Sequence, residues 1–156
     1  MQTPSFKYSD LKNFVLVAFL FLTACGGGSS GGGGSTQFAG TYSGTETLTI
    51  TFQGQAETGS GALTITITPD GRVTVVDEAG TVHRGSLNGV NFNAMGGAQG
   101  LTDPSTPGVT CNINQTYVGS VNGNTITGTA SGSITCTGAT TITANFSGNF
   151  TATLGG

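Results

Sequence analysis

From Gln37 onwards, apolar residues alternate with threonine, serine, asparagine or glycine. Leu48, Ile50 and Phe52, for example, have threonine at each position between them. A period of two is that of a β-strand with one buried face and one face in water. Threonine suits the outer positions, because its branched Cβ favours extended backbone and its hydroxyl faces water. We therefore expect an all-β domain over residues 37–156.

Short segments rich in glycine, asparagine and proline separate the alternating stretches and are typical of hairpin turns. Eight strands joined mostly by hairpins favour an eight-stranded up-and-down antiparallel barrel, since closure removes exposed sheet edges. A two-sheet β-sandwich is the alternative. The connection at 96–108 is too long for a hairpin, and we expect recognition residues there. The expected strands are 41–53, 59–68, 72–77, 81–87, 90–95, 109–121, 125–136 and 140–154.

The first 25 residues have the layout of a secretory leader. A polar start with Lys7 and Lys12 is followed by an apolar run from Phe14 to Leu22 and by small residues that end at Cys25. The apolar run is shorter than the roughly 20 helical residues that span a bilayer, so it cannot serve as a durable transmembrane helix. Residues 1–24 are therefore expected to be a signal peptide.

The segment Leu22-Thr23-Ala24-Cys25 resembles the lipobox of bacterial lipoproteins. The resemblance implies that the Cys25 thiol receives a diacylglyceryl group, that a signal peptidase cuts before it, and that the new amino terminus is acylated, for example with palmitate. Several acyl chains hold firmly, because each buried methylene contributes about 0.8 kcal/mol. Gly26 in place of aspartate favours the outer membrane, facing either the periplasm or the cell surface. The alternatives are an ordinary signal peptide with a chance cysteine and a buried core segment.

Residues 25–36 are expected to form the lipidated cysteine and a flexible Gly/Ser linker (GGGSSGGGGST). This run matches G-x-G-x-x-G and G-x-S-x-G by composition alone. Both motifs need a strand before them and a helix after them, and here a leader precedes and a β-rich segment follows.

Cys111 and Cys136 lie on neighbouring predicted strands. If Gly123-Asn124 is the two-residue turn between these strands, the two cysteines lie directly opposite each other, whereas a turn at Asn122-Gly123 offsets them diagonally. The first register, together with export from the reducing cytosol, predicts a structural disulfide. Closing the loop would stabilise the domain by roughly 3–4 kcal/mol, and less if the strands are already paired.

Charged residues make up 7% of the chain, against about 25% in typical soluble domains. Once the leader is removed, the cations that remain are Arg72 and Arg84. Binding of nucleic acid is disfavoured, because phosphate recognition needs clustered lysine and arginine.

Catalytic and metal-binding groups are scarce. His83, the single histidine, is expected to be an exposed strand residue, and Asp77 and Glu78 to be solvated charges at a turn edge. A histidine without a placed carboxylate or nucleophile cannot do general acid/base work, so we expect no enzyme, no catalytic residue and no cofactor. A metal site is disfavoured for want of further ligands.

The aromatic residues of the domain are expected to fill its core rather than to line a cavity: Tyr42, Phe52, Phe92, Tyr117, Phe146 and Phe150. The inward positions of the strand at 125–136 include small residues, which either let a neighbour such as Tyr117 pack closely or leave room for a ligand. These inward positions are Ile126, Gly128, Ala130, Gly132 and Ile134.

The Gly/Thr strand pattern with its Asn-Gly turn (VNGNTITGTASGSITC) is similar to the small lipocalin-like or avidin-like barrels of bacterial lipoproteins. A narrower similarity is to the barrels of transferrin-binding and factor H-binding surface lipoproteins, which also place glycines after the lipidated cysteine. The resemblance implies an envelope or surface lipoprotein whose barrel is a non-catalytic binding module. Its partners are the membrane, through lipid on Cys25, and a small apolar ligand or a protein. The alternatives are a structural envelope lipoprotein and an enzyme.

Overall fold

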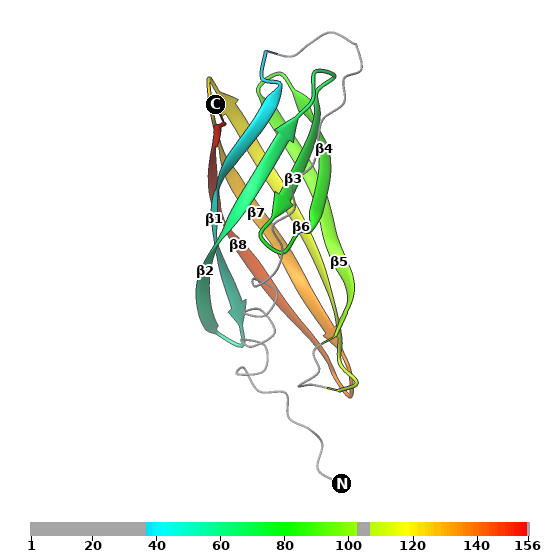
Figure 1. Ribbon diagram of the computed structural model, residues 1–156. Helices are drawn as coiled ribbons and strands as arrows, with labels where there is room; N and C mark the ends of the chain where they lie inside the picture. Colours follow the sequence, from blue (N-terminus) through cyan, green and yellow to red (C-terminus); the bar gives the residue numbers. More distant parts are fainter. Residues whose placement is uncertain (1–36, 103–106, 156) are drawn as a thin grey trace.

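The computed structural model describes residues 37–102 and 107–155, and these form a closed antiparallel barrel (Figure 1). Each strand pairs with the next along the chain, and the last pairs with the first. The predicted up-and-down barrel is confirmed, and the sandwich alternative is wrong. The strands are β1 (Gly40–Phe52), β2 (Gln55–Ile67), β3 (Arg72–Asp77), β4 (Val82–Asn88), β5 (Asn91–Thr102), β6 (Thr110–Asn122), β7 (Thr125–Thr137) and β8 (Thr141–Leu154).

The predicted leader, the lipidation site Cys25 and the linker lie outside the described residues. Among the residues described, no helix is long and apolar enough to cross a membrane.

The alternation of the sequence sets which side chains enter the barrel. Leu63, Ile65 and Ile67 are buried on β2, whereas the threonines between them are partly exposed. Two core clusters result, and Leu48 packs against both. The main cluster includes Tyr42, Phe92, Tyr117 and Phe150, and the disulfide cluster comprises Phe52, Cys111, Ile134, Cys136, Ala144 and Phe146.

All six aromatic residues expected in the core are buried. The inward glycines of β7 are covered by aromatic rings of β8, because a Cβ on Gly128 would lie 2.6 Å from Cζ of Phe150 and a Cβ on Gly132 would collide with Phe146. These small residues therefore serve close packing. The partners of the two glycines are Phe150 and Phe146, and Tyr117 lies directly opposite the small residue between them, Ala130.

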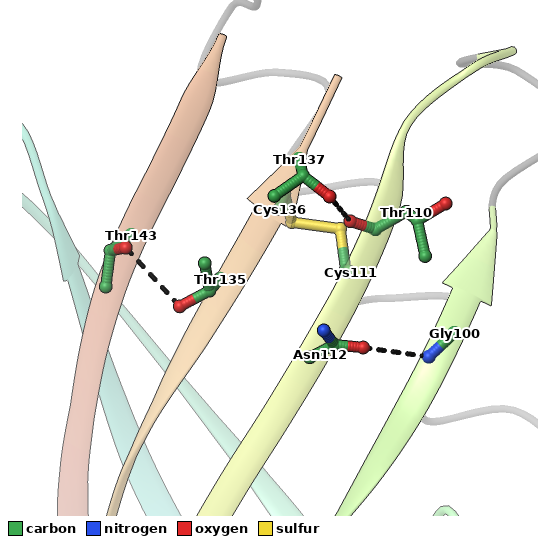
Figure 2. The surroundings of a disulfide bond; sticks show 8 residues. All are labelled: Gly100, Thr110, Cys111, Asn112, Thr135, Cys136, Thr137 and Thr143. Atoms are coloured by element: carbon green, nitrogen blue, oxygen red, sulfur yellow. Dashed lines mark hydrogen bonds between the residues drawn. A yellow bond between two sulfur atoms is a disulfide. The ribbon is translucent and has the colours of Figure 1, made fainter.

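The β6–β7 hairpin has the register that the Gly123-Asn124 turn predicts, with Cys111 opposite Cys136. A disulfide joins the two residues, and beside it the Thr137 hydroxyl donates a hydrogen bond to the Thr110 carbonyl (Figure 2). The diagonal alternative is wrong.

The prediction of a long connection at 96–108 is wrong for the first half of that segment. β5 continues to Thr102 and pairs with β6 through a bulge between Ala98 and Leu101. Inside the bulge the Gly100 amide donates to Oδ1 of Asn112 at 2.9 Å (Figure 2). Strand pairing uses backbone groups and needs no side chains. The glycines of this segment therefore interrupt the apolar–polar alternation of the sequence, but they do not end the strand. Residues 103–106 of the connection lie outside the described part of the chain.

Candidate functional site: a polar cluster beside an interruption of the barrel wall

The β3–β4 hairpin is much shorter than the strands on either side of it (Figure 1). β3 has 6 residues and β4 has 7, against 13 in β2 and 12 in β5. In the described part of the chain, Gln55–Ala62 forms sheet pairs only with β1, and Gly97–Thr102 only with β6. The β3–β4 hairpin therefore ends before it reaches these two segments, and neither has a sheet partner among the described residues on the side of the hairpin. We call this part of the barrel wall the wall interruption.

Apolar side chains at the level of the wall interruption retain some exposure. At this level Ile50 lies on β1 opposite Glu57 of β2, and Leu101 lies on β5 opposite Cys111 of β6. Ligand sites in proteins are commonly lined by partly exposed apolar side chains held on a rigid scaffold. The partly buried side chains that pack against the disulfide cluster are Leu48, Ile50, Leu101, Val109, Ile113 and Ile142.

Polar side chains lie inside the barrel near the residues where the β3–β4 hairpin ends. Gln115 donates a hydrogen bond from Nε2 to the Tyr117 hydroxyl at 2.7 Å, and that hydroxyl donates to Oε2 of Glu46 at 2.8 Å. All three residues are buried. With Asp77 and His83 they form what we call the interior polar cluster.

The ends of the short hairpin place the last two members of the cluster. Asp77 pairs with Leu63 and His83 pairs with Gly96, and these are the last residue pairs of the hairpin with β2 and β5 before the wall interruption. Gly96 also pairs with Gln115 on β6. The cluster therefore lies at the end of the β3–β4 hairpin, next to the wall interruption.

The prediction that His83 is an exposed strand residue is wrong, because its exposed fraction is 0%. Its ring packs edge-on against Tyr117, with 4.9 Å between ring centroids. Gly96 makes room for it, since a Cβ there would lie 2.8 Å from Cδ2 of His83. The sequence held the signal for this placement: His83 and Leu87 share one parity on β4, and Leu87 packs against the main cluster.

His83 is unusual in a second respect. Both ring nitrogens are buried, and neither makes a hydrogen bond of good geometry, although the backbone of Val75 and Thr81 lies close enough to oppose the effect of burial on the pKa of His83. Buried polar groups in native proteins are nearly always hydrogen-bonded, so an orphaned imidazole calls for an explanation.

The acidic residues at the turn are also less exposed than predicted. Asp77 and Glu78 are half-buried rather than solvated. Asp77 accepts a hydrogen bond from the Thr81 amide at 2.8 Å, and Glu78 accepts one from the Ala62 amide at 3.3 Å. They are partly buried because the turn folds against β2 instead of projecting from the barrel.

Glu46 was not singled out from the sequence, although it shares its parity on β1 with Tyr42 and Leu48. Its exposed fraction is 2%. Gly61 lies opposite it on β2, so no Cβ competes for the space beside its side chain. A glutamate at an inward position of an otherwise apolar face was the available sign of an interior polar site.

The barrel interior disfavours charge. The pKa of Glu46 is raised to about 7, chiefly by burial; the Tyr117 hydrogen bond lowers it, and the nearby carboxylates of Asp77 and Glu78 add to the increase. Burial also raises the pKa of Asp77 and lowers the pKa of His83. At neutral pH the Glu46 carboxyl is thus close to half protonated.

Chemically, the interior polar cluster offers hydrogen-bond donors, acceptors and one carboxyl that titrates near neutrality. Groups of this kind fix the orientation of a ligand in a mostly apolar site. Within residues 37–102 and 107–155, no three histidine, cysteine, aspartate or glutamate side chains are arranged to hold a metal ion.

Comparison with known proteins adds no family to this description. Neither a scan against models of protein families nor a search of curated proteins finds a significant match.

Proposed function

We propose that this protein is an envelope lipoprotein, held by acyl chains on Cys25, whose barrel is a non-catalytic binding module for a small, mostly apolar ligand. The observation that carries the binding role is the wall interruption, which has partly exposed apolar side chains at its level and the interior polar cluster at its inner end. Anchoring and a location at the outer membrane are supported by the lipobox-like segment Leu22-Thr23-Ala24-Cys25.

The linker suits such an arrangement. A Gly/Ser chain of the length of residues 26–36 has a typical end-to-end distance of roughly 20 Å. In our proposal, a spacer of this length would keep the barrel near the bilayer, where apolar ligands concentrate.

A purely structural barrel would have little use for the interior polar cluster. Each buried polar group costs stability unless it is hydrogen-bonded, and well-packed apolar residues of similar volume would be at least as stable. Two carboxyls and an unpartnered imidazole in one small region are therefore more readily explained by ligand recognition than by stability.

The binding role can be tested with N-phenyl-1-naphthylamine, a dye that fluoresces in apolar surroundings. The mature chain from residue 25, carrying Cys25→Ser to remove the acyl chains, should bind the dye. Ile113→Asp should abolish binding, because it places a charge among the apolar side chains at the wall interruption.

The matched control is Val118→Asp on the same strand, since Val118 is 50% exposed and faces outward. This variant should bind the dye as the parent chain does, and circular dichroism should show both variants folded. Equal binding by the two folded variants, or no binding by the parent, would contradict the proposal.

A further inference from the structure

The charges inside the barrel are unbalanced. Asp77 and Glu46 bring two carboxyls to the interior polar cluster, and no arginine or lysine of the described residues joins them. Arg72 is 81% exposed and forms an ion pair with Asp70 at 2.8 Å, and Arg84 is exposed on β4. The cluster can therefore offer negative charge that has no cationic side chain to neutralise it.

His83 supplies a second and independent observation. A neutral imidazole has one N–H donor and one acceptor nitrogen, and here both are buried and unpartnered. Desolvating them without a partner costs stability. A polar atom of a bound ligand that formed a hydrogen bond with the ring would therefore offset this loss of stability.

The other described residues around the cluster add no cation, and Glu57 of β2, opposite Ile50 at the level of the wall interruption, adds a further carboxyl. β2 and β5 contribute the glycines Gly61 and Gly96 beside the cluster, and Phe150 of β8 packs edge-on against Tyr117 with 5.5 Å between ring centroids. The titratable side chains around Glu46 of β1 come from β3, the turn after β3, β4 and β6. Asp77, Glu78 and Tyr117 act on Glu46 directly, and His83 acts on Asp77.

We propose that the interior polar cluster binds the amino group of an apolar amine, whose hydrocarbon body lies against the apolar side chains at the wall interruption. This inference rests on the proposed function and names the ligand class. An ammonium has three donors, which match the carboxyls of Glu46 and Asp77 and the acceptor nitrogen of His83. A carboxylate ligand would meet two acidic groups and no cation, and is therefore disfavoured.

Proton release follows from this geometry. A cation beside the Glu46 carboxyl favours its ionised form, and Glu46 is close to half protonated at neutral pH in the free protein. Binding of an ammonium near pH 7 should thus expel a fraction of a proton. Affinity for the amine should fall as the pH drops below about 7, because Glu46 becomes protonated.

The test compares three ligands of equal chain length, namely decylamine, 1-decanol and decanoate, as competitors of the dye on the mature Cys25→Ser chain. Decylamine should bind at least about tenfold more tightly than decanol, and decanoate most weakly. Glu46→Gln should lower the ratio of decylamine affinity to decanol affinity several-fold, because it removes one of the two carboxyls that match the ammonium. Asp70→Asn removes the same charge from an exposed turn residue, and it should keep the preference for the amine.

A calorimetric measurement on the chain with Glu46 intact covers the case in which Glu46→Gln does not fold. Titration of decylamine at pH 7 in two buffers of different ionisation enthalpy should reveal proton release, and decanol should release none. Equal affinities for the three ligands, or amine binding without proton release, would overturn this inference and leave the proposed function standing. Failure of all three ligands and the dye to bind would overturn the proposed function as well.

Discussion

Single residues decide what the barrel interior can do. Glu46 and His83 occupy inward positions that the alternation assigns to the core, yet neither is apolar. Sequence parity could have placed both inside. It could not show that both contact Tyr117, because contacts between β1, β4 and β6 depend on how the sheet closes.

Stability should depend on pH through Glu46. Its folded-state pKa is raised from 4.5 to about 7, so its stabilising contribution is complete below pH 4.5 and is lost as the pH rises through 7. The loss amounts to roughly 3 kcal/mol. Urea unfolding at pH 5 and pH 8 should therefore show a smaller decline in unfolding free energy for Glu46→Gln than for the parent. An identical decline in both proteins would show that Glu46 titrates normally.

His83 should contribute packing rather than hydrogen bonding to the stability of the unliganded barrel. His83→Ala removes a fully buried ring and should lower the unfolding free energy by about 2 kcal/mol or more. His83→Leu keeps most of the volume and removes two unpartnered nitrogens, so it should be at least as stable as the parent. The melting temperatures of the two variants distinguish these effects, and equal damage by both substitutions would mean that the ring nitrogens are satisfied in solution.

At the level of elements, strands were predictable where side chains alternate and not where glycine replaces them. The short strands at 72–77 and 81–87 were located within about a residue. The neighbouring strands were predicted too short, because the segments 55–58 of β2 and 96–102 of β5 lack an apolar alternation. The wall interruption exists because β2 and β5 are longer than the β3–β4 hairpin between them. It could not be predicted, because the extra length of these two strands was not predicted.

The register of the β6–β7 hairpin was predictable once the turn was placed at Gly123-Asn124, although the sequence also allowed a turn at Asn122-Gly123. Replacing both Cys111 and Cys136 with alanine should lower the unfolding free energy by up to roughly 3–4 kcal/mol, with the paired strands reducing the effect. Urea unfolding measures the change. Two free thiols in unreduced exported protein, detected by mass spectrometry, would instead show that the bond does not form in the cell.

The whole molecule combines a charge-poor barrel with an N-terminal sequence that resembles a lipobox. Charged residues make up 7% of the chain, and the outer faces of β7, β8 and β1 carry threonine, serine and asparagine. Such a surface stays hydrated through hydroxyls and amides. The fold class was predictable from this pattern, whereas attachment to a membrane is a proposal that depends on residues outside the described part.

Attachment should depend on a single thiol. Cys25→Ser should abolish incorporation of labelled palmitate and move the protein from the membrane fraction to the soluble fraction or leave it unprocessed, because Cys25 is the acyl acceptor of the lipobox-like segment. Fractionation of cells that express each form measures this. Continued labelling of the variant would show that the anchor is elsewhere.

The central claim is that a small apolar ligand binds beside the wall interruption, and amide chemical-shift mapping by NMR tests it most directly. Titration of the mature Cys25→Ser chain with N-phenyl-1-naphthylamine should shift amides of Gln55–Ala62 and Gly97–Thr102, together with those of the interior polar cluster. Shifts confined to the outer face around Met95 and Val118, or no shifts at all, would contradict the account.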